Sequence, residues 1–275
     1  MRARSLIGML TLSCGLLVLA ASSANAAKND HILYTPARGG GVVGSMNKAN
    51  LVNHGGPVIV SAKAVFIFWG PTFAVPGPDQ VYAQTLQAFR NQFGTTPEYK
   101  VITQYSGIMP ANLGTGTPDW FDVSVPPVAV TDADVQAEVQ TYLTTHAFNP
   151  STIYEVVIPS TSYSSNGTIG SCGAPLVRYC AYHSWIGSGA SAIKYSIQPY
   201  PSCSACRVAG VPDVANQERF VCHETREAVT DPVGTAWYDT SGNEADEKCN
   251  GTFFGTGGYF YQTEWSNLAG GCVKF

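Results

Sequence analysis

The sequence of 275 residues lacks the short motifs that mark several large classes of enzyme. It has no G-x-S-x-G stretch, which argues against the nucleophilic serine of an α/β-hydrolase, and no G-x-x-x-x-G-K-[ST] loop, which argues against nucleotide chemistry. Charged residues make up only 12% of the chain, and lysine and arginine form no basic patch. Because nucleic-acid binding depends on such patches, we expect no nucleic acid among the partners.

Long apolar runs are also missing, with one exception at the N-terminus. Arg2 and Arg4 precede an apolar run over residues 6–21, and residues 24–26 (ANA) have the small-x-small pattern of a cleavage site. This order is typical of a secretory signal peptide. No second run approaches the ~18 residues that a membrane span requires. We therefore expect residues 1–26 to be removed and the rest to be a soluble extracellular protein without a membrane span, or a periplasmic one in a bacterium.

Cysteine is absent from residues 27–171 and frequent after them. The C-terminal half holds seven, at Cys172, Cys180, Cys203, Cys206, Cys222, Cys249 and Cys272. An exported protein uses most of its cysteines in disulfides, and an odd number leaves one unpaired. We expect Cys222 to be free, because it lies within a predicted helix. Pairing of sequence neighbours is plausible (Cys172 with Cys180, Cys203 with Cys206, Cys249 with Cys272), but the sequence does not determine the connectivity.

The hydrophobic patterns alternate between strand-like and helix-like stretches. Residues 27–52 are glycine-rich and without periodicity, which predicts a flexible N-terminal segment. Strands are predicted at 58–70, 98–105, 153–160, 177–185 and 192–200, with a closing pair at 259–265 and 271–275; helices are predicted at 79–93, at 131–146 and from about Asp213. The sequence thus predicts one α/β (α+β) domain over residues 53–275. We expect a mixed β-sheet flanked by helices, with disulfides stapling its C-terminal half.

The stretch HETRE at residues 223–227 differs in one letter from the HExxH helix of zinc peptidases. On a helix that ends before Pro232, one face is apolar and carries Val221, Cys222, Thr225, Ala228 and Val229. On another side, an arc of about 100° gathers His223, Glu224, Glu227 and Asp231. Arg219 and Arg226 point away from this arc. Carboxylates that cluster without a cation repel each other, and a divalent ion would relieve the repulsion.

By analogy with HExxH enzymes, Glu224 is the expected general base and His223 and Glu227 are expected metal ligands. A third ligand is expected from Asp231 or from Glu244 or Asp246 in the acidic loop that follows. His183 lies on a preceding strand as a further ligand or a transition-state donor. Zinc is the expected ion, although the carboxylates also suit manganese or calcium. The alternatives are a solvated acidic helix face, an ordinary acidic loop and a packed histidine.

Several blocks of the sequence resemble the phosphate-induced protein, or EXORDIUM-like, family of secreted plant proteins, which has bacterial and fungal relatives. The blocks are residues 53–70, 180–185, 203–206, 223–239, 243–251 and 264–273. The resemblance implies an extracellular protein, with plant members linked to growth and cell-wall responses, and no established reaction. Glu227 matches the family's own pattern. Plant members have Gly in place of Cys222 and Asn in place of Asp231, so Asp231 is not a ligand common to the family.

Two functions are consistent with this sequence. The first is a secreted, zincin-like metallopeptidase that acts on an extracellular protein or peptide. The second is a non-catalytic extracellular or cell-wall-associated protein, whose acidic cluster holds a structural ion or only hydrogen bonds. A cell-wall component is the expected partner in the second case.

Overall fold

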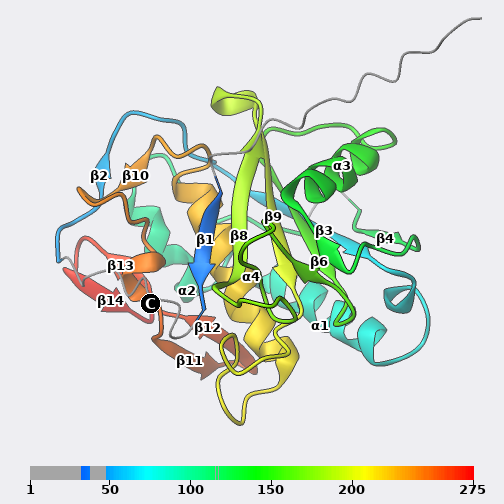
Figure 1. The fold of residues 1–275 in the computed structure, drawn as a ribbon. Coiled ribbons are helices and arrows are strands. Elements are labelled where there is room, and N and C mark those ends of the chain that lie inside the picture. Colours follow the sequence, from blue (N-terminus) through cyan, green and yellow to red (C-terminus); the bar gives the residue numbers. More distant parts are fainter. Residues whose placement is uncertain (1–31, 38–47, 115, 117) are drawn as a thin grey trace, which may run out of the picture.

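We describe the fold from a computed structural model, which places residues 32–37, 48–114, 116 and 118–275. The predicted signal peptide, residues 1–26, lies outside the described residues. The centre of the molecule is a six-stranded sheet in the order β1-β8-β9-β6-β3-β4 (Figure 1). Its strands are β1 (Leu33–Pro36), β8 (Tyr179–Ile186), β9 (Ile193–Pro199), β6 (Thr152–Ile158), β3 (Lys63–Trp69) and β4 (Trp120–Asp122). Strands β9, β6, β3 and β4 pair in parallel, whereas β8 pairs antiparallel with both β9 and β1, so the sheet is mixed as predicted.

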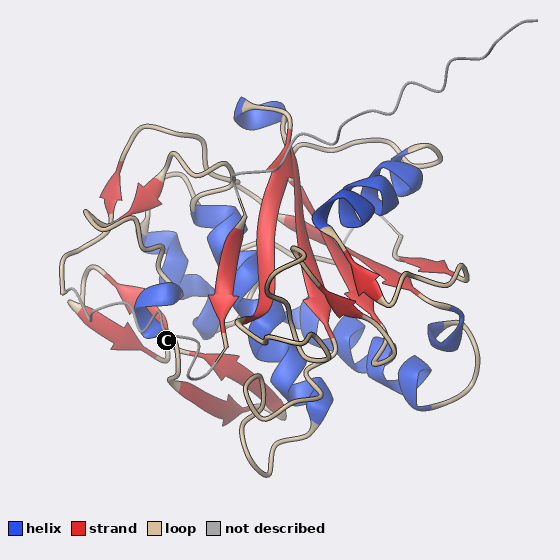
Figure 2. Ribbon diagram, viewed as in Figure 1, coloured by secondary structure: helices blue, strands red, loops and turns tan. Residues whose placement is uncertain are grey.

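Helices cover both faces of the sheet (Figure 2). They are α1 (Pro78–Phe93), α3 (Asp132–Leu143) and α4 (Asp213–Thr230). Successive side chains of a strand point to opposite faces, and β3 illustrates the result. Phe66 and Phe68 join a core cluster with residues of α1 and α4, while Val65 and Ile67 join a second cluster with residues of α3. Both faces of the sheet are therefore buried.

Short elements surround this framework. The two-stranded pairs are β2 (Val52–Asn53) with β10 (Trp237–Tyr238), β5 (Ala129–Val130) with β7 (Tyr163–Ser164), β11 (Phe253–Thr256) with β12 (Tyr259–Gln262), and β13 (Glu264–Ser266) with β14 (Gly271–Val273). The short helices are η1 (Pro71–Phe73), α2 (Pro97–Lys100), η2 (Val101–Gln104), η3 (Gly189–Ser191) and η4 (Glu247–Cys249).

The predicted strand at residues 98–105 is wrong, because this stretch forms α2 and η2. Pro97 stands at the start of the helix, where its missing N–H costs nothing, and the Thr96 side chain accepts a hydrogen bond from the Tyr99 N–H. Tyr99, Ile102 and Tyr105 then recur every three residues and are all buried. The apolar content indicated a strand, but the spacing and the cap favour a helix.

The N-terminal segment is also more ordered than predicted. Residues 27–52 are expected to be flexible, yet Leu33–Pro36 form β1 at the edge of the main sheet, so the prediction is wrong for this stretch. The Tyr34 ring packs against the rings of Tyr179 and Tyr182 at centroid distances of 4.5 and 5.5 Å. Main-chain pairing with β8 and these ring contacts hold the strand in place.

Three disulfides staple the C-terminal half. They join Cys172 to Cys203, Cys180 to Cys206, and Cys249 to Cys272. Only the last pair joins the expected neighbours; pairing of Cys172 with Cys180 and of Cys203 with Cys206 is wrong. Cys203 and Cys206 lie on one turn, and this turn is fastened to two different segments. Cys222 is buried and is the free cysteine of the described residues, as predicted.

Candidate metal centre on helix α4

Helix α4 is buried on all sides over most of its length. Every residue from Asn216 to Thr230 is buried, and Glu224 and Glu227 have no exposed surface at all. The predicted apolar face is confirmed, since Val221 and Val229 lie in the core between α1 and the sheet. The opposite, acidic face does not meet water, because β8 and the segment after the helix cover it. The alternative of a solvated acidic face is therefore excluded.

His223 and Glu227 face each other one turn apart. Their Nε2 and Oε2 atoms lie 3.0 Å apart, and neither atom has a hydrogen-bond partner among the described residues. The neighbouring atoms are held: the His223 Nδ1 lies 3.3 Å from the Gln262 Oε1, and the Glu227 Oε1 accepts the Glu247 N–H. An imidazole that donates from Nδ1 to Gln262 would offer its Nε2 lone pair to a metal ion, once the ion has displaced the proton from Nε2.

Glu247 brings a third carboxylate to this pair. Its Oε1 lies 3.6 Å from the His223 Nε2, and one fifth of its side chain is exposed. Glu247 belongs to the acidic loop but is not among the ligands expected from the sequence. The usable signal was its position two residues before Cys249, whose disulfide to Cys272 ties η4 to β14.

His183 and Glu244 lie on the other side of Glu227. The His183 Nδ1 lies 3.1 Å from the Glu224 Oε2 and 3.6 Å from the Glu227 Oε2, and its Nε2 lies 3.6 Å from the Glu244 Oε2. The His183 Nε2 and both oxygens of Glu244 have no hydrogen-bond partner in the part of the chain that the structure describes. The structure thus brings both residues to the cluster.

Two groups of residues around Glu227 have a geometry that could hold a metal ion. One group comprises His223, Glu224 and Glu227, the other His183, Glu227 and Glu244, and within each group one donor atom from each residue lies within 4.8 Å of the others. Glu227 belongs to both. The residue in place of the second histidine of HExxH is therefore at the centre of the cluster.

The other two predicted ligands are engaged elsewhere. Asp246 forms a buried ion pair with Arg226 and accepts a hydrogen bond from the Gln262 amide. Asp231 accepts the N–H groups of Thr235 and Ala236 at 2.6 and 2.7 Å, which stabilises the turn after α4. Neither residue belongs to a metal-compatible group of the described residues. The ion pair with Arg226 therefore accounts for the Asp246 carboxylate.

Several residues of the cluster have a pKa that differs from that of a free side chain. Burial raises the pKa of Glu227 well above its usual value, and the charge of Glu247 raises it further. Burial and the charge of Glu227 likewise raise the pKa of Glu244. Burial lowers the pKa of His223, but the nearby Glu247 carboxylate and the other surrounding carboxylates outweigh it and raise the pKa to about 10. Burial also acts against ionisation of Glu247, but its contacts with His223 and Glu227 bring its pKa down to about 2. The raised pKa of Glu227 and of Glu244 favours their protonated forms.

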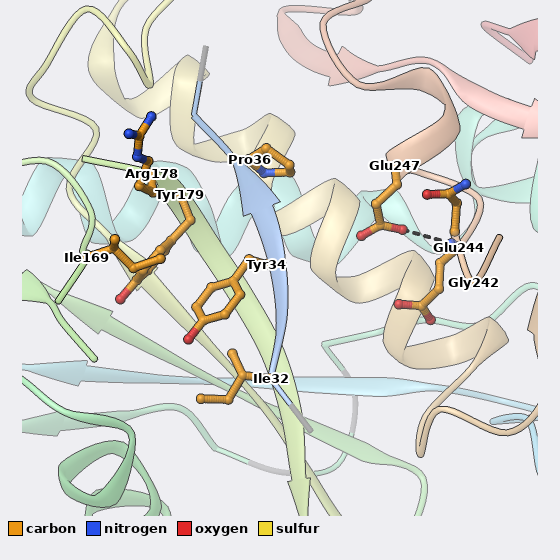
Figure 3. A pocket seen from close by; sticks show the side chains of 10 residues that line it. Ile32, Tyr34, Pro36, Ile169, Arg178, Tyr179, Gly242, Glu244 and Glu247 are labelled. Carbon is orange, nitrogen blue, oxygen red and sulfur yellow. Dashed lines mark hydrogen bonds between the residues drawn. The ribbon is translucent and has the colours of Figure 1, made fainter. Parts of the chain in front are cut away.

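A cavity of about 470 Å³ leads from the surface to the outer edge of the cluster (Figure 3). Tyr34 and Pro36 of β1 and Tyr179 of β8 line one side, and Glu244 and Glu247 line the other. His183, His223 and Glu224 do not line it, and each has no exposed surface. The cavity therefore reaches the outer carboxylates but stops short of the rest.

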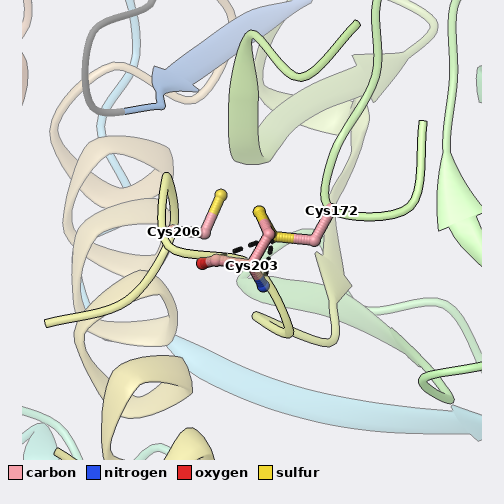
Figure 4. A group of neighbouring side chains, drawn as sticks. All are labelled: Cys172, Cys203 and Cys206. Carbon is pink, nitrogen blue, oxygen red and sulfur yellow. Dashed lines mark hydrogen bonds between the residues drawn. A yellow bond between two sulfur atoms is a disulfide. The ribbon is translucent and has the colours of Figure 1, made fainter. Parts of the chain in front are cut away.

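A second set of metal-type donors has a different explanation. Sulfur atoms of Cys172, Cys203 and Cys206 lie within 4.8 Å of one another (Figure 4). All three sulfurs are in disulfides, however, and a disulfide sulfur is not the thiolate that binds a metal. This group is a structural clamp.

The innermost end of the cluster contacts the N-terminal strand. The Thr35 hydroxyl donates a hydrogen bond to the Glu224 Oε1, while the Glu224 Oε2 faces His183. Thr35 is itself buried. Both oxygens of the expected general base are therefore occupied by protein groups.

Comparisons with protein-family models, with curated proteins and with solved structures find no match to this chain. The resemblance to EXORDIUM-like proteins therefore rests on the sequence blocks alone. Among the residues that the structure places, no helix is both long and apolar enough to cross a membrane.

Proposed function

We propose that this protein is a secreted, metal-dependent hydrolase, a peptidase of the zincin-like kind. His223, Glu227 and Glu247 would hold the metal, and Glu224 would be the general base. The observation that carries the proposal is the fully buried contact of the His223 Nε2 with the Glu227 Oε2 at 3.0 Å, in which neither atom makes a regular hydrogen bond with a described residue. Buried polar atoms without regular hydrogen bonds are costly, and a divalent cation would satisfy both.

The donors present fit a divalent ion. One imidazole nitrogen and two carboxylates differ from the two-histidine, one-glutamate set of catalytic zinc sites by one carboxylate in place of an imidazole; carboxylates do bind zinc, and they also suit manganese or calcium. Gln262 beside the His223 Nδ1 and the Glu247 N–H on Glu227 orient the two ligands of the helix. Such outer contacts are a regular part of metal sites. The raised pKa of Glu227 supports the proposal, because a cation would take the place of the proton that this carboxyl otherwise holds.

The remaining residues match the needs of hydrolysis. A bound divalent metal supplies a polarised carbonyl and a more acidic water. Glu224 shares a metal-compatible group with His223 and Glu227, which supports a role in which its carboxylate would take the proton of an attacking water. His183 lies 3.1 Å from Glu224 and positions that carboxylate, or donates to the oxygen on which charge develops.

Export is the second part of the proposal. The signal-peptide pattern of residues 1–26 supports it, as do the three disulfides, which form and persist in oxidising compartments. The substrate would then be an extracellular protein or peptide.

One observation favours a second function. His183, His223, Glu224 and Glu227 are entirely buried, and closed sites without an open position are typical of structural metals. In that case the protein is a non-catalytic extracellular or cell-wall-associated protein, in keeping with its resemblance to EXORDIUM-like proteins, and the ion stabilises the packing of α4 against η4.

Metal analysis and one substitution separate these functions. We would measure the metals bound to the secreted protein and its hydrolysis of casein and peptides, and compare the variant Glu224→Gln. The control is Glu218→Gln, a buried glutamate on the same helix that accepts the Phe260 N–H. A hydrolase loses activity in Glu224→Gln alone and still binds metal. Stoichiometric metal without any hydrolysis favours the structural ion. Protein free of metal and without activity contradicts the hydrolase and leaves a non-catalytic protein whose cluster makes only hydrogen bonds.

A further inference from the structure

Strand β1 affects access to the cluster around Glu227. We propose that the edge of β8 is a binding site for an extended peptide, and that residues Leu33–Pro36 occupy it in this structure as an intramolecular blocking strand. That the peptide is a substrate rests on the proposed function, whereas peptide binding by β8 does not.

Without β1, strand β8 would be the edge of the main sheet. An edge strand presents a row of unpaired N–H and C=O groups, to which an extended peptide adds as a further strand. β1 does this in the antiparallel direction, with Tyr34 opposite Tyr182 and Thr35 opposite Ala181. The pairing continues past the strand, since the Ala37 N–H donates to the Arg178 carbonyl at 2.9 Å. β8 is thus a surface that accepts a peptide in a defined register.

The same strand, β8, carries one residue of the cluster. His183 of β8 lies 3.1 Å from Glu224, and Leu33 of β1 stands opposite His183 in the register. Two residues further along β1, the Thr35 hydroxyl donates to the Glu224 carboxylate. A peptide on β8 therefore passes directly over the expected general base, where the scissile bond of a substrate would have to lie.

The face of β1 turned away from Glu224 indicates which residues such a peptide carries. Tyr34 packs against the rings of Tyr179 and Tyr182, and it lines the cavity of about 470 Å³ with Pro36. Aromatic rings bury a large apolar area and prefer such tilted and edge-to-face contacts. We infer that the site selects an extended peptide with an aromatic residue followed by a small one, as Tyr34 and Thr35 are.

Burial shows why β1 blocks the centre. His183 and Glu224 have no exposed surface, and Thr35 is 1% exposed. A hydrolase must admit both water and a peptide to its general base, and neither reaches Glu224 while the Thr35 hydroxyl occupies it. Displacement of β1 removes this contact and leaves the edge of β8 free. The closed site that favours a structural ion is thus also explained by a strand that can leave.

The test is peptide binding by the full chain before and after one cut. A recognition sequence for a sequence-specific protease is inserted between Gly39 and Val43, and the folded protein is cut there. The control carries the same insertion at residues 74–76, an exposed stretch between η1 and α1. The probe is a fluorescent peptide of residues 29–38 (NDHILYTPAR), with a Tyr34→Ala version as its own control. Binding is followed by fluorescence anisotropy.

We expect the cut protein to bind the probe with an apparent affinity at least about tenfold higher than the control, because the affinity for a competing ligand falls with the fraction of open sites. The uncut variant Tyr34→Ala weakens the docking of β1 and shifts the affinity in the same direction. Equal binding by cut and control proteins, or loss of folding on cutting, would overturn the proposal and make β1 an ordinary strand.

The two proposals fail in different ways. If the cut protein binds the probe but hydrolyses no peptide with metal present, the blocking strand stands and the hydrolase is wrong. If the uncut protein already hydrolyses peptides through Glu224 and the cut changes neither rate nor binding, the hydrolase stands and the blocking strand is wrong.

Discussion

The Oε2 of Glu227 lies 3.0 Å from the Nε2 of His223, one turn earlier on the same helix. The contact joins the two positions that the HExxH motif reserves for metal ligands, with a carboxylate in place of the second imidazole. Glu247 reaches the pair from η4, and the Glu247 N–H holds the other oxygen of Glu227. The helix and the disulfide-bound segment after it therefore build one centre together.

We predict that Glu247→Gln weakens metal binding more than Glu244→Gln does. Glu247 faces His223, whereas Glu244 faces His183, so the two variants distinguish the two metal-compatible groups around Glu227. Changes at or beside metal ligands cost about 10–100-fold in metal affinity. Competition with a coloured chelator gives the affinities. A larger loss in Glu244→Gln would assign the metal to His183, Glu227 and Glu244 instead.

Asp246→Asn should destabilise the fold rather than remove the metal. Asp246 shares the buried guanidinium of Arg226 with Glu264, whose Oε2 lies 2.7 Å from the Arg226 Nε. Loss of one charged partner leaves Arg226 only partly neutralised, at a cost of about 3 kcal/mol. Urea unfolding of the metal-free protein measures it. A variant as stable as the parent protein, with reduced metal affinity, would return Asp246 to the ligands.

The stability of the protein should depend on pH through Glu155. This residue of β6 accepts hydrogen bonds from Ser196, Gln198 and the Thr225 hydroxyl of α4. Burial raises its pKa to about 7, although these hydrogen bonds counteract the effect. The folded state thus binds this proton more tightly than the unfolded state. The contribution is complete below the ordinary pKa of 4.5 and is lost as the pH rises through about 7.

Glu155→Gln tests this dependence. The shift corresponds to about 3 kcal/mol between pH 4.5 and pH 8. The difference in unfolding free energy between parent and variant should therefore change over this range and level off above it. The absolute stability of the variant is not the criterion, because glutamine loses one acceptor at every pH. A difference that stays constant from pH 4.5 to pH 8 would show that Glu155 is ionised throughout.

Cys222 should be unreactive in the folded protein. It is fully buried in the core beside Val221, and burial raises the pKa of its thiol to about 12. Because thiolates are the reactive form, a chain without residues 1–26 should show no accessible thiol when folded and one after unfolding. A thiol reagent with an optical signal counts them. Cys222→Ala should keep all three disulfides and cost about 1–2 kcal/mol for the lost packing. Two or three thiols after unfolding would contradict the assigned pairs.

Much of the fold follows from local patterns that the sequence displays. The apolar run before Gly70 becomes the buried strand β3, and the spacing of Leu86, Phe89 and Phe93 becomes the buried face of α1. The helical structure of residues 98–105 was not predicted, because the apolar residues there fit the period of a strand as well as that of a helix. The Thr96 cap decides in favour of the helix. The free Cys222 was predictable from its place within α4, whereas the partners of Cys203 and Cys206 depend on which segments the turn meets.

For the candidate site, the sequence by itself determined the helix, its apolar face and the placing of His223, Glu224 and Glu227 on one side, because a fixed helical period sets these relations. Only the tertiary structure decided the rest. Arg226 engages Asp246 in a buried ion pair, and η4, which a disulfide joins to β14, brings the Glu247 Oε1 to 3.6 Å from the His223 Nε2. β1 brings Thr35 to Glu224 across a separation of 189 residues. Contacts between segments so distant depend on how the whole chain packs, and no local pattern of residues encodes them.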